Sequence, residues 1–268
     1  MKYPTNDKNV IDLECSYFNT DEFSWVRPLE LEWEAIKNEL EEYTKSEGLA
    51  SFSQGYSTLV EGSWTALPLI FWNLKRNNST FFPKTMSMFE QIPHCTSISF
   101  SQLAAGSVIK PHFGENNAYY RCHLALTVPA QLPDLGFRVG GEEREWQEGK
   151  VLVFNDAKMH SAFNFSDHNR TIVIFDVWRD EYIHCYKEAV LHQLAIYALF
   201  FELKLVLNCN PFNQNEVYWY NAKEKLSPKM YSRHMELYQF FSDHFIGPYF
   251  DNAASEFFFD LWDKSGGV

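Results

Sequence analysis

The sequence predicts a mainly β fold, a sandwich or barrel, with helices before and after it. Short apolar runs separated by turn residues fill the region from residue 96 to residue 178, a pattern typical of antiparallel sandwiches and barrels. From residue 186 onward the pattern becomes helical, with runs around 186–206, 230–246 and 252–263. Hydrophobic residues make up 46% of the 268 residues, so a sizeable buried core is expected.

An amphipathic helix is predicted near the N-terminus. Pro28 suits the first turn of this helix, and Gly48 suits its end. The apolar residues recur at offsets of four, three, four and three, which places them on one face of the helix: Leu29, Trp33, Ile36, Leu40 and Tyr43.

Two further elements are predicted before the strand-rich region. Residues 63–73 have the pattern of an extended segment. Pro68 places this strand at an edge or makes it irregular, because proline cannot donate a hydrogen bond to a neighbouring strand. Thr85 is expected to cap a short helix that reaches Gln91, and Pro93 ends it.

The strand-rich region begins with a half-buried strand. Residues 96–102 alternate Ser97, Ser99 and Ser101 with Ile98 and Phe100, which is the period of a strand with one buried face. Turns are indicated at residues 140–141 and 148–149, both of which contain glycine. The other strand candidates are residues 107–110, 122–128, 136–139, 151–154 and 171–178.

The charge balance argues against a nucleic-acid partner. The chain has 23 basic and 35 acidic residues, a formal net charge of −12, whereas binding to a phosphate backbone needs clustered lysine and arginine. The five cysteines are widely spaced and form no C-x-x-C pair, which indicates reduced thiols in a cytoplasmic compartment. The N-terminal residues lack the apolar core of a signal peptide, so none is expected.

The most apolar segment, residues 190–207, is predicted to be a buried helix. It contains His192, Gln193, Glu202 and Lys204, whereas a bilayer span needs roughly 20 apolar residues with few charges. No membrane span is therefore expected. Because no low-complexity linker precedes this segment, we expect a core over residues 1–180 with a helical extension, residues 181–268, packed on it.

Two histidines, each followed by an arginine, are the leading candidates for a functional site. His112 and His160 each lie in a short polar connection beside a strand-like run, with Arg121 and Arg170 nine and ten residues later. Two neutral imidazoles suit a borderline divalent metal such as iron(II), and arginine offers a planar fork that matches a carboxylate. The repeat favours a metal site that chelates an organic acid over core histidines and surface arginines.

Strand periodicity places a further polar residue beside Arg121. Arg121 and His123 share one face of their predicted strand, and Cys122 and Leu124 share the other. If the first face lines the interior of a barrel, that interior is polar. Such an interior is costly unless it binds something.

An ordered set of short motifs covers residues 97–178. It consists of PHFG, RCHLALTVP, WQEGKVLVFND, the MH of His160, the NR of Arg170 and a final DVW. In this order and spacing, the motifs resemble the aspartyl/asparaginyl β-hydroxylase family of iron(II)- and 2-oxoglutarate-dependent oxygenases. The resemblance implies a double-stranded β-helix, or jelly-roll, core and an enzyme that uses Fe(II), the cosubstrate 2-oxoglutarate and O2.

At the metal, the resemblance implies that His112 and His160 are the iron ligands and that Asp156 is an acid near an iron-bound water. Many iron oxygenases carry a carboxylate ligand two residues after the first histidine, where this chain has Gly114. The resembled family also lacks that carboxylate. A position left open at iron accepts water or halide, so radical halogenation is an alternative to hydroxylation.

At the cosubstrate, the resemblance implies that Ser101 and Arg170 hold the distal carboxylate of 2-oxoglutarate. Arg121 and His123 match residues that lie beside its metal-chelating end. All four residue types stand at the matching positions of this chain. The resemblance therefore implies a complete cosubstrate site.

The expected reaction is hydroxylation of an unactivated C–H bond in an amino acid, peptide or related small molecule, with release of succinate and CO2. Family members that act on aspartyl side chains place basic residues where this chain has Ser99 and Tyr119. A neutral or basic reacting group is therefore expected here. The alternatives are a 2-oxoglutarate-dependent halogenase and a metal- or organic-acid-binding module without turnover. The substrate and the oligomeric state are left open.

Overall fold

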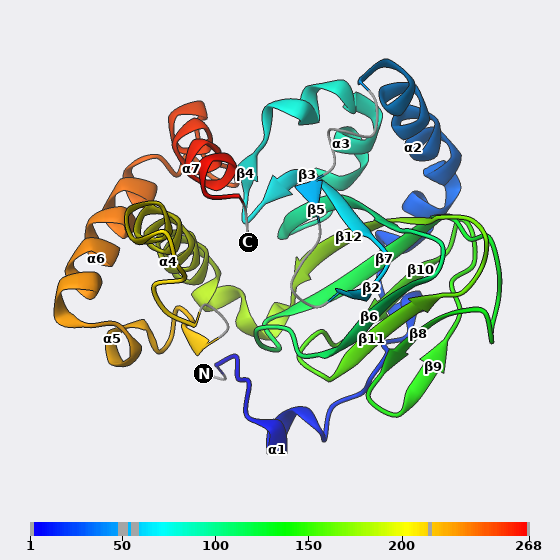
Figure 1. The fold of residues 1–268 in the computed structure, drawn as a ribbon, viewed down its shortest axis with the longest axis horizontal. Coiled ribbons are helices and arrows are strands. Elements are labelled where there is room, and N and C mark those ends of the chain that lie inside the picture. Colours follow the sequence, from blue (N-terminus) through cyan, green and yellow to red (C-terminus); the bar gives the residue numbers. More distant parts are fainter. Residues whose placement is uncertain (1–2, 48–52, 55–58, 214–215, 267–268) are drawn as a thin grey trace. The chain divides into compact units, whose positions relative to one another are not determined.

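The computed structural model describes residues 3–47, 53–54, 59–213 and 216–266. The chain forms two compact units (Figure 1). The β unit comprises Met1–Leu69 and Asn77–Asp180, and the helical unit comprises Ile70–Arg76 and Glu181–Val268. The short segment around β4 (Leu74–Lys75) thus belongs with the C-terminal helices, although it lies far from them in the sequence.

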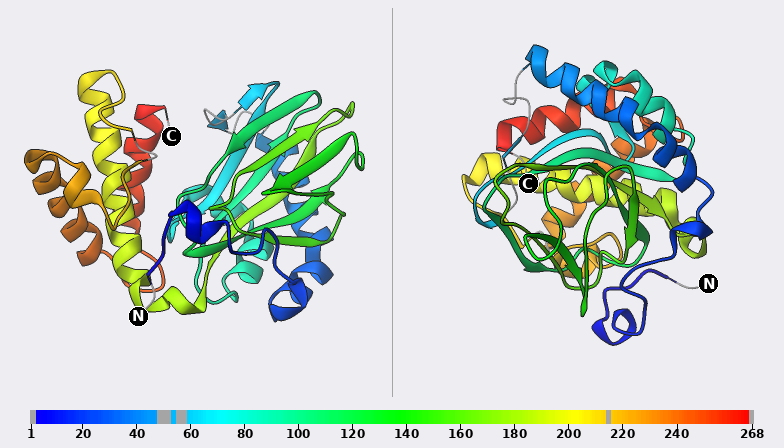
Figure 2. Two further views of the ribbon diagram at one scale, coloured as in Figure 1. Left: turned by 90° about the horizontal axis from the view of Figure 1, so that it is seen from below. Right: turned by 90° about the vertical axis from the view of Figure 1, so that its right-hand side faces the viewer.

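Two antiparallel sheets form the β unit, and the views of Figure 2 show them face to face. Within the described residues, the larger sheet has the order β1-β3-β5-β12-β7-β10, and the smaller has the order β2-β6-β11-β8-β9. The larger sheet contains β1 (Ser53–Gln54), β3 (Trp64–Phe71), β5 (Cys95–Leu103), β12 (Arg170–Trp178), β7 (Tyr119–Thr127) and β10 (Val151–Phe154). The smaller contains β2 (Leu59–Glu61), β6 (Ser107–His112), β11 (His160–Asn164), β8 (Leu135–Val139) and β9 (Glu142–Arg144).

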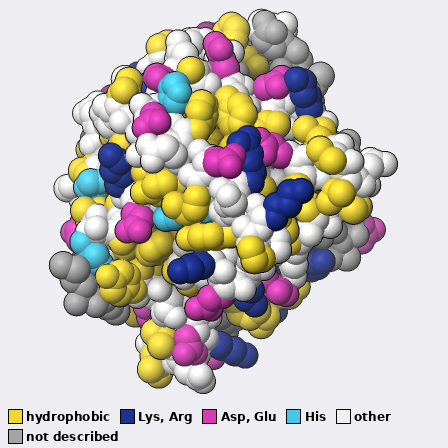
Figure 3. Space-filling model, turned by 90° about the vertical axis from the view of Figure 1, so that its left-hand side faces the viewer, with side chains coloured by type: hydrophobic (Ala, Val, Ile, Leu, Met, Phe, Trp, Pro, Cys, Tyr) yellow, Lys and Arg dark blue, Asp and Glu magenta, His cyan; other side chains and the backbone are white. Residues whose placement is uncertain are grey.

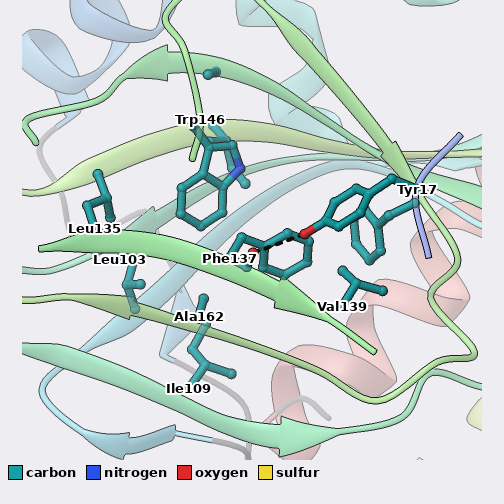
Figure 4. Close-up of a cluster of buried hydrophobic side chains, with 11 residues drawn as sticks. Tyr17, Leu103, Ile109, Leu135, Phe137, Val139, Trp146 and Ala162 are labelled. Carbon is teal, nitrogen blue, oxygen red and sulfur yellow. Dashed lines mark hydrogen bonds between the residues drawn. The ribbon is translucent and has the colours of Figure 1, made fainter. Parts of the chain in front are cut away.

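The core of the β unit lies between these sheets. Leu103 and Ile172 come from the larger sheet, and Ile109, Phe137 and Ala162 come from the smaller one, all at most 5% exposed (Figure 4). Side chains from the inner faces of both sheets thus form one apolar layer, as in other β sandwiches. The predicted fold class, a cupin-like jelly-roll core with helices before and after it, is confirmed.

The predicted strands are all present. Among the described residues, β1, β2, β4, β9 and β11 are additional. β9 consists of three exposed charged residues, which carry no apolar alternation. β11 begins at His160 itself, within a stretch that the sequence indicated only as a polar connection. Pro68 lies in β3 outside the pairs that β3 forms with its short neighbours β1 and β4, so its missing N–H removes none of those hydrogen bonds.

Helices cover the outer face of the larger sheet. After the short helices α1 (Lys8–Ile11) and η1 (Thr20–Glu22), helix α2 (Val26–Glu47) contacts β7. Helix α3 (Pro83–Phe89) follows η3 (Asn77–Phe81) and packs Phe89 against Phe175 of β12. The predicted apolar face of α2 is buried at Leu29, Ile36, Leu40 and Tyr43 and half-buried at Trp33. Gly48 lies outside the described residues.

The prediction that Thr85 caps α3 is wrong. The helix begins at Pro83, and its first N–H groups are satisfied by a side chain from α2. The Glu39 carboxylate accepts hydrogen bonds from the N–H groups of Lys84, at 2.6 Å, and Thr85, at 2.7 Å. A negative charge at a helix N-terminus is also favoured by the helix dipole.

The helical unit is built around α4 (Tyr186–Leu207), which follows η4 (Asp180–Cys185). It packs against α6 (Pro228–Asp243) and α7 (Asn252–Ser265), and α5 (Ala222–Lys225) precedes α6. By length and composition alone, residues Asp180–Leu207 are apolar enough to cross a membrane, and 61% of their most apolar window is buried in the structure. A buried core helix has the same composition, so the absence of a membrane span stays a prediction, as does packing of the extension on the core.

The surface view in Figure 3 shows acidic and basic side chains scattered among apolar ones on one face of the molecule. The five cysteines are all unpaired thiols. The expectations of a cytoplasmic location and of no nucleic-acid partner remain predictions.

A pair of histidines, the buried His234 and the half-buried His192, lies between α4 and α6. Nδ1 of His192 lies 2.9 Å from Nε2 of His234, and the rings are within 11° of parallel, so one N–H donates to the other ring's lone pair. Burial, followed by the neighbouring His192, lowers the pKa of His234 to about 4. The other groups facing this pair are Glu188, 3.9 Å from His192 Nε2, Tyr231 and Tyr238.

We expect this pair to make the folded chain less stable as the pH falls from about 6.5 to about 4. An unfolded histidine takes up a proton near pH 6.5, whereas folded His234 does so only near pH 4, so protons favour the unfolded state in this window. Between about pH 7.5 and about pH 5 the loss is on the order of 2 kcal/mol. Urea unfolding followed by circular dichroism measures it.

The matched control for this effect is the exposed His168. His234→Gln should reduce the loss of unfolding free energy between about pH 7.5 and about pH 5 by on the order of 2 kcal/mol, whereas His168→Gln should leave it as in the wild type. Equal pH dependence in the wild type and His234→Gln would show that the pair does not titrate as described.

Candidate active site

The two histidines that the sequence singled out face each other across neighbouring strands. His112 ends β6 and His160 begins β11, the two residues are paired in the sheet register, and their ring centroids are 4.1 Å apart. Each Nδ1 lies 2.8 Å from the backbone oxygen two residues earlier, that of Lys110 or Lys158. A carbonyl only accepts, so each Nδ1 carries the proton and each Nε2 keeps its lone pair.

Both rings are neutral at physiological pH. Burial lowers the pKa of His112, and it lowers the pKa of His160 to about 4. Neutral imidazoles with Nδ1–H held by carbonyl groups are the usual state of metal-ligating histidines. The pair is therefore prepared to bind a divalent metal through Nε2.

A buried carboxylate lies beside this pair. Oδ1 of Asp156 is 3.5 Å from Nε2 of His160 and accepts a hydrogen bond from Nη1 of Arg121 at 2.8 Å. Oδ2 of Asp156 is buried and has no hydrogen-bond partner among the described residues. Burying an unpaired carboxylate oxygen costs free energy, and a divalent cation or its bound water would satisfy this atom. The donor set thus fits iron(II).

Gly114 makes room for that carboxylate. Its N–H donates to the backbone oxygen of Asp156 at 2.8 Å. A Cβ at position 114 would collide with Oδ2 of Asp156. The position where many iron oxygenases carry a ligand carboxylate is thus filled here by the carboxylate of Asp156, which comes from a different segment.

We expect Gly114→Ala to lower iron(II)-dependent turnover by about tenfold to a hundredfold, because the methyl group displaces the Asp156 carboxylate from the metal site. The control is Gly141→Ala, since a Cβ there contacts nothing within 4 Å. The measurement is the rate of succinate formation at saturating iron and 2-oxoglutarate. Wild-type rates in Gly114→Ala would show that the position of Asp156 does not matter.

The pocket also contains a buried cation that no carboxylate among the described residues pairs with. Arg170, on β12, is 2% exposed, and its Nε has no hydrogen-bond partner in the part of the chain that the structure describes. Burial lowers its pKa to about 9. Ser101, on the neighbouring strand β5, is completely buried. A carboxylate would neutralise Arg170 and accept a hydrogen bond from Ser101, so these residues fit one end of 2-oxoglutarate.

Arg121 is engaged differently from Arg170. It donates to Asp156 through Nη1, and it holds Asp176 through Nε, at 2.8 Å, and Nη2, at 3.0 Å. Burial alone would lower the pKa of Arg121, but the charges of Asp156 and Asp176 raise it well above its ordinary value. Three of its five N–H donors are thus taken by carboxylates. Arg121 thus joins the acid beside the histidines, Asp156, to Asp176 on β12.

One pocket collects six of the predicted site residues, and Asp156 lies beside it through its contact with His160. The six lining residues are Ser101, His112, Arg121, His123, His160 and Arg170. Their roles in binding iron and 2-oxoglutarate remain predictions, but their proximity is a property of the fold. The expected polar face of β7 does line the interior, because Arg121 and His123 both reach the pocket.

Three residues of this site were missed from the sequence. Asp176 holds Arg121, Trp64 donates to Ser101, and Trp146 donates to His123. Asp176 lies in the predicted strand 171–178, at period two from Ile172 and Ile174. An acidic residue on this otherwise apolar strand face could have been recognised from the sequence as a candidate site residue. The two tryptophans gave none, because aromatic residues in such a chain are mostly core.

Fold and site together define a cupin-like β sandwich in which two neutral histidines, a carboxylate and a buried arginine meet at one pocket. The chain belongs to the aspartyl/asparaginyl β-hydroxylase family, whose model, described as Aspartyl/Asparaginyl beta-hydroxylase, matches residues 30–180. This match confirms the resemblance drawn from the motifs.

The relatives of this chain include two kinds of hydroxylase, according to their names. Over 165 residues, it is 32% identical to an ornithine lipid ester-linked acyl 2-hydroxylase of Rhizobium tropici, covering 59% of each chain. It is also 32% identical over 165 residues to the aspartyl/asparaginyl beta-hydroxylase of Homo sapiens, covering 58% of this chain and 21% of that relative. The match therefore spans about a fifth to three fifths of these relatives' own lengths.

Solved structures with a similar fold are distant in sequence. HygX from Streptomyces hygroscopicus, determined with nickel and 2-oxoglutarate bound, aligns with a TM-score of 0.36 and 12% identity over 52% of this chain and 78% of that chain. A predicted oxalate decarboxylase from Thermotoga maritima aligns with a TM-score of 0.33 and 11% identity over 48% of this chain and 93% of that chain. Likenesses this distant carry no argument about function.

Proposed function

We propose that this chain is an Fe(II)/2-oxoglutarate-dependent dioxygenase that hydroxylates an unactivated C–H bond. The observation that carries the proposal is Arg170, a buried guanidinium that no carboxylate among the described residues pairs with, in the same pocket as His112 and His160. A buried unpaired charge is costly. A dicarboxylate that binds the metal at one end and Arg170 at the other removes that cost.

Each residue has a definite task in this proposal. His112 and His160 would hold the metal through Nε2, while their Nδ1–H groups stay on backbone oxygens. Arg170 and Ser101 would hold the distal carboxylate, and His123 would donate to the cosubstrate nearer the metal. Bound iron(II) with 2-oxoglutarate supplies the oxidising chemistry, in which O2 is consumed and succinate and CO2 are released.

The pocket walls keep water away from these contacts. Phe137, Phe154 and Ile174 line it together with the histidines and Arg170. In such an apolar setting, the attraction between Arg170 and a carboxylate is stronger than in water. The same walls protect the oxidising centre from side reactions with solvent.

Asp156 supports hydroxylation in preference to halogenation. Its Oδ1 lies 3.5 Å from Nε2 of His160, and its Oδ2 has no hydrogen-bond partner among the described residues. A carboxylate there accepts a hydrogen bond from a metal-bound water and repels a halide ion. Halogenation would require a halide to bind against that charge.

The reacting group of the substrate is proposed to be neutral or basic. Ser99 lies on β5 opposite Ile174, which lines the pocket, and its hydroxyl donates to the backbone oxygen of Phe100. Tyr119 is buried with its ring 5.6 Å from the Arg121 guanidinium, which already holds two carboxylates. Ser99, Tyr119 and the already paired Arg121 therefore offer no cation to an acidic group of a substrate. The relatives' names suggest an amino-acid, peptide or acyl substrate.

The test is turnover by the purified chain with iron(II), 2-oxoglutarate and air. Amino acids, peptides and acylated amino acids are supplied as a panel, with and without chloride or bromide. Substrate-dependent succinate together with a product one oxygen atom heavier supports the proposal. A halogenated product would show that the chain is a halogenase instead. Binding of 2-oxoglutarate without succinate formation from any substrate would favour a binding module without turnover.

A further inference from the structure

Two indole N–H groups contact polar residues of the pocket. Nε1 of Trp146 lies 3.2 Å from Nδ1 of His123, and Nε1 of Trp64 lies 2.9 Å from Oγ of Ser101. An indole N–H donates and never accepts. Nδ1 of His123 must therefore accept, which leaves the ring proton on Nε2. The Ser101 oxygen accepts in the same way, so its own hydrogen is left to donate elsewhere.

Trp146 also supports the buried guanidinium. The Cζ atom of Arg170 lies 4.7 Å from the centre of the indole ring, within the range of a cation–π contact. The indole is itself fixed, since it is 1% exposed and stacks on Phe137 at 5.4 Å, as its place among the core side chains in Figure 4 shows. One rigid side chain thus contacts both His123 and Arg170.

We infer that Trp146 is a positioning residue that makes His123 an Nε2–H donor and holds Arg170 ready for the same anion. The inference rests on the proposed function, because the anion is taken to be 2-oxoglutarate. With Ser101 turned into a donor by Trp64, the pocket presents donors from three residues. Carboxylate oxygens only accept, so the pocket matches a dicarboxylate and is unsuited to ligands that need acceptors.

The same contact excludes His123 from the metal. Its Nδ1 lone pair is occupied by Trp146, and its Nε2 carries the proton. Burial, followed by the charge of Arg170, keeps the pKa of His123 well below its ordinary value, so the ring is neutral. Although His123 lines the pocket with the other two histidines, it is left to donate a hydrogen bond.

The first arm of the test reads the tautomer directly, without metal or cosubstrate. Long-range ¹H–¹⁵N correlation spectra of the labelled full chain distinguish protonated from unprotonated imidazole nitrogens, and His123→Gln identifies the His123 signals. We expect the wild type to show the Nε2–H form. Trp146→Phe should lose that fixed pattern, whereas Trp33→Phe, a change on α2 outside the pocket, should keep it. An Nδ1–H pattern in the wild type would overturn the inference even if the Trp146 variants do not fold.

The second arm measures 2-oxoglutarate binding by calorimetry with zinc(II), which supports no turnover, in the iron site. Trp146→Phe keeps a ring beneath Arg170 but loses the N–H, so the affinity should fall about threefold to tenfold. Trp146→Leu loses both contacts, so its affinity for 2-oxoglutarate should fall further. The affinity for zinc should stay unchanged in both variants.

The two arms separate the inference from the proposed function. A wild-type chain that binds no 2-oxoglutarate would overturn both the proposed function and the role of Trp146 in holding it. A wild type that binds it, beside a Trp146→Phe variant with unchanged His123 signals and unchanged affinity, would overturn the inference alone.

Discussion

Alanine at His160 is expected to abolish iron(II) binding at micromolar metal and to remove all 2-oxoglutarate turnover. The two histidines are the only imidazoles among the described residues that present an unprotonated Nε2 to this pocket, since His123 carries its proton there. Asp156 has only Oδ2 left for a metal, because Arg121 holds Oδ1, and one carboxylate oxygen with a single imidazole is too few ligands for tight binding. The loss should be the same for His112→Ala, because neither ligand can cover for the other.

The measurement is equilibrium dialysis against iron(II) under anaerobic conditions, with His168→Ala as the control. His168 is exposed, lies before the start of β12 and is not among the residues that line the pocket. His168→Ala should bind one equivalent of iron as the wild type does. Undiminished iron binding in either His112→Ala or His160→Ala would remove the metal site from this pocket.

Alanine at Arg170 is expected to leave iron binding intact and to raise the 2-oxoglutarate requirement strongly. Removing a two-point, charge-assisted contact to a desolvated carboxylate costs on the order of 2–5 kcal/mol, or roughly thirtyfold to several thousandfold in affinity. The full burial of the guanidinium places the effect in the upper part of this range. Arg170→Lys should restore only part of the affinity, because an ammonium cannot reproduce the planar fork.

The control for this prediction is Arg138→Ala on β8. Arg138 is an exposed arginine paired with Glu143, and such surface pairs contribute little. The concentration of 2-oxoglutarate that gives half-maximal succinate formation is compared among the variants. An unchanged requirement in Arg170→Ala would mean that the buried guanidinium serves another anion.

The strands and the polar pocket face were predictable because strand periodicity is local. The alternation at Ser97, Ser99 and Ser101 placed β5 correctly, and the same period put Arg121 and His123 together on β7. β9 escaped prediction because its exposed charged residues owe their strand state to pairing with β8. The cap of α3 escaped because it comes from Glu39, on another helix.

The ligand residues of the site were predictable, and the residues that orient them were not. His112, His160 and Arg170 were identified by motif and spacing, without any knowledge of how they meet. The collision that forbids a side chain at Gly114, the grip of Asp176 on Arg121 and the indole N–H at His123 depend on three-dimensional packing. The periodicity of the sequence does not indicate which tautomer a histidine adopts.

The central claim is that iron and 2-oxoglutarate share the pocket between His112, His160 and Arg170. It is tested most directly by an anaerobic crystal structure of the full chain with iron(II) and N-oxalylglycine, an unreactive 2-oxoglutarate mimic. We expect the metal on Nε2 of both histidines and the distal carboxylate on the Arg170 guanidinium and the Ser101 hydroxyl. Metal bound elsewhere, or a mimic that leaves Arg170 unpaired, would contradict the account.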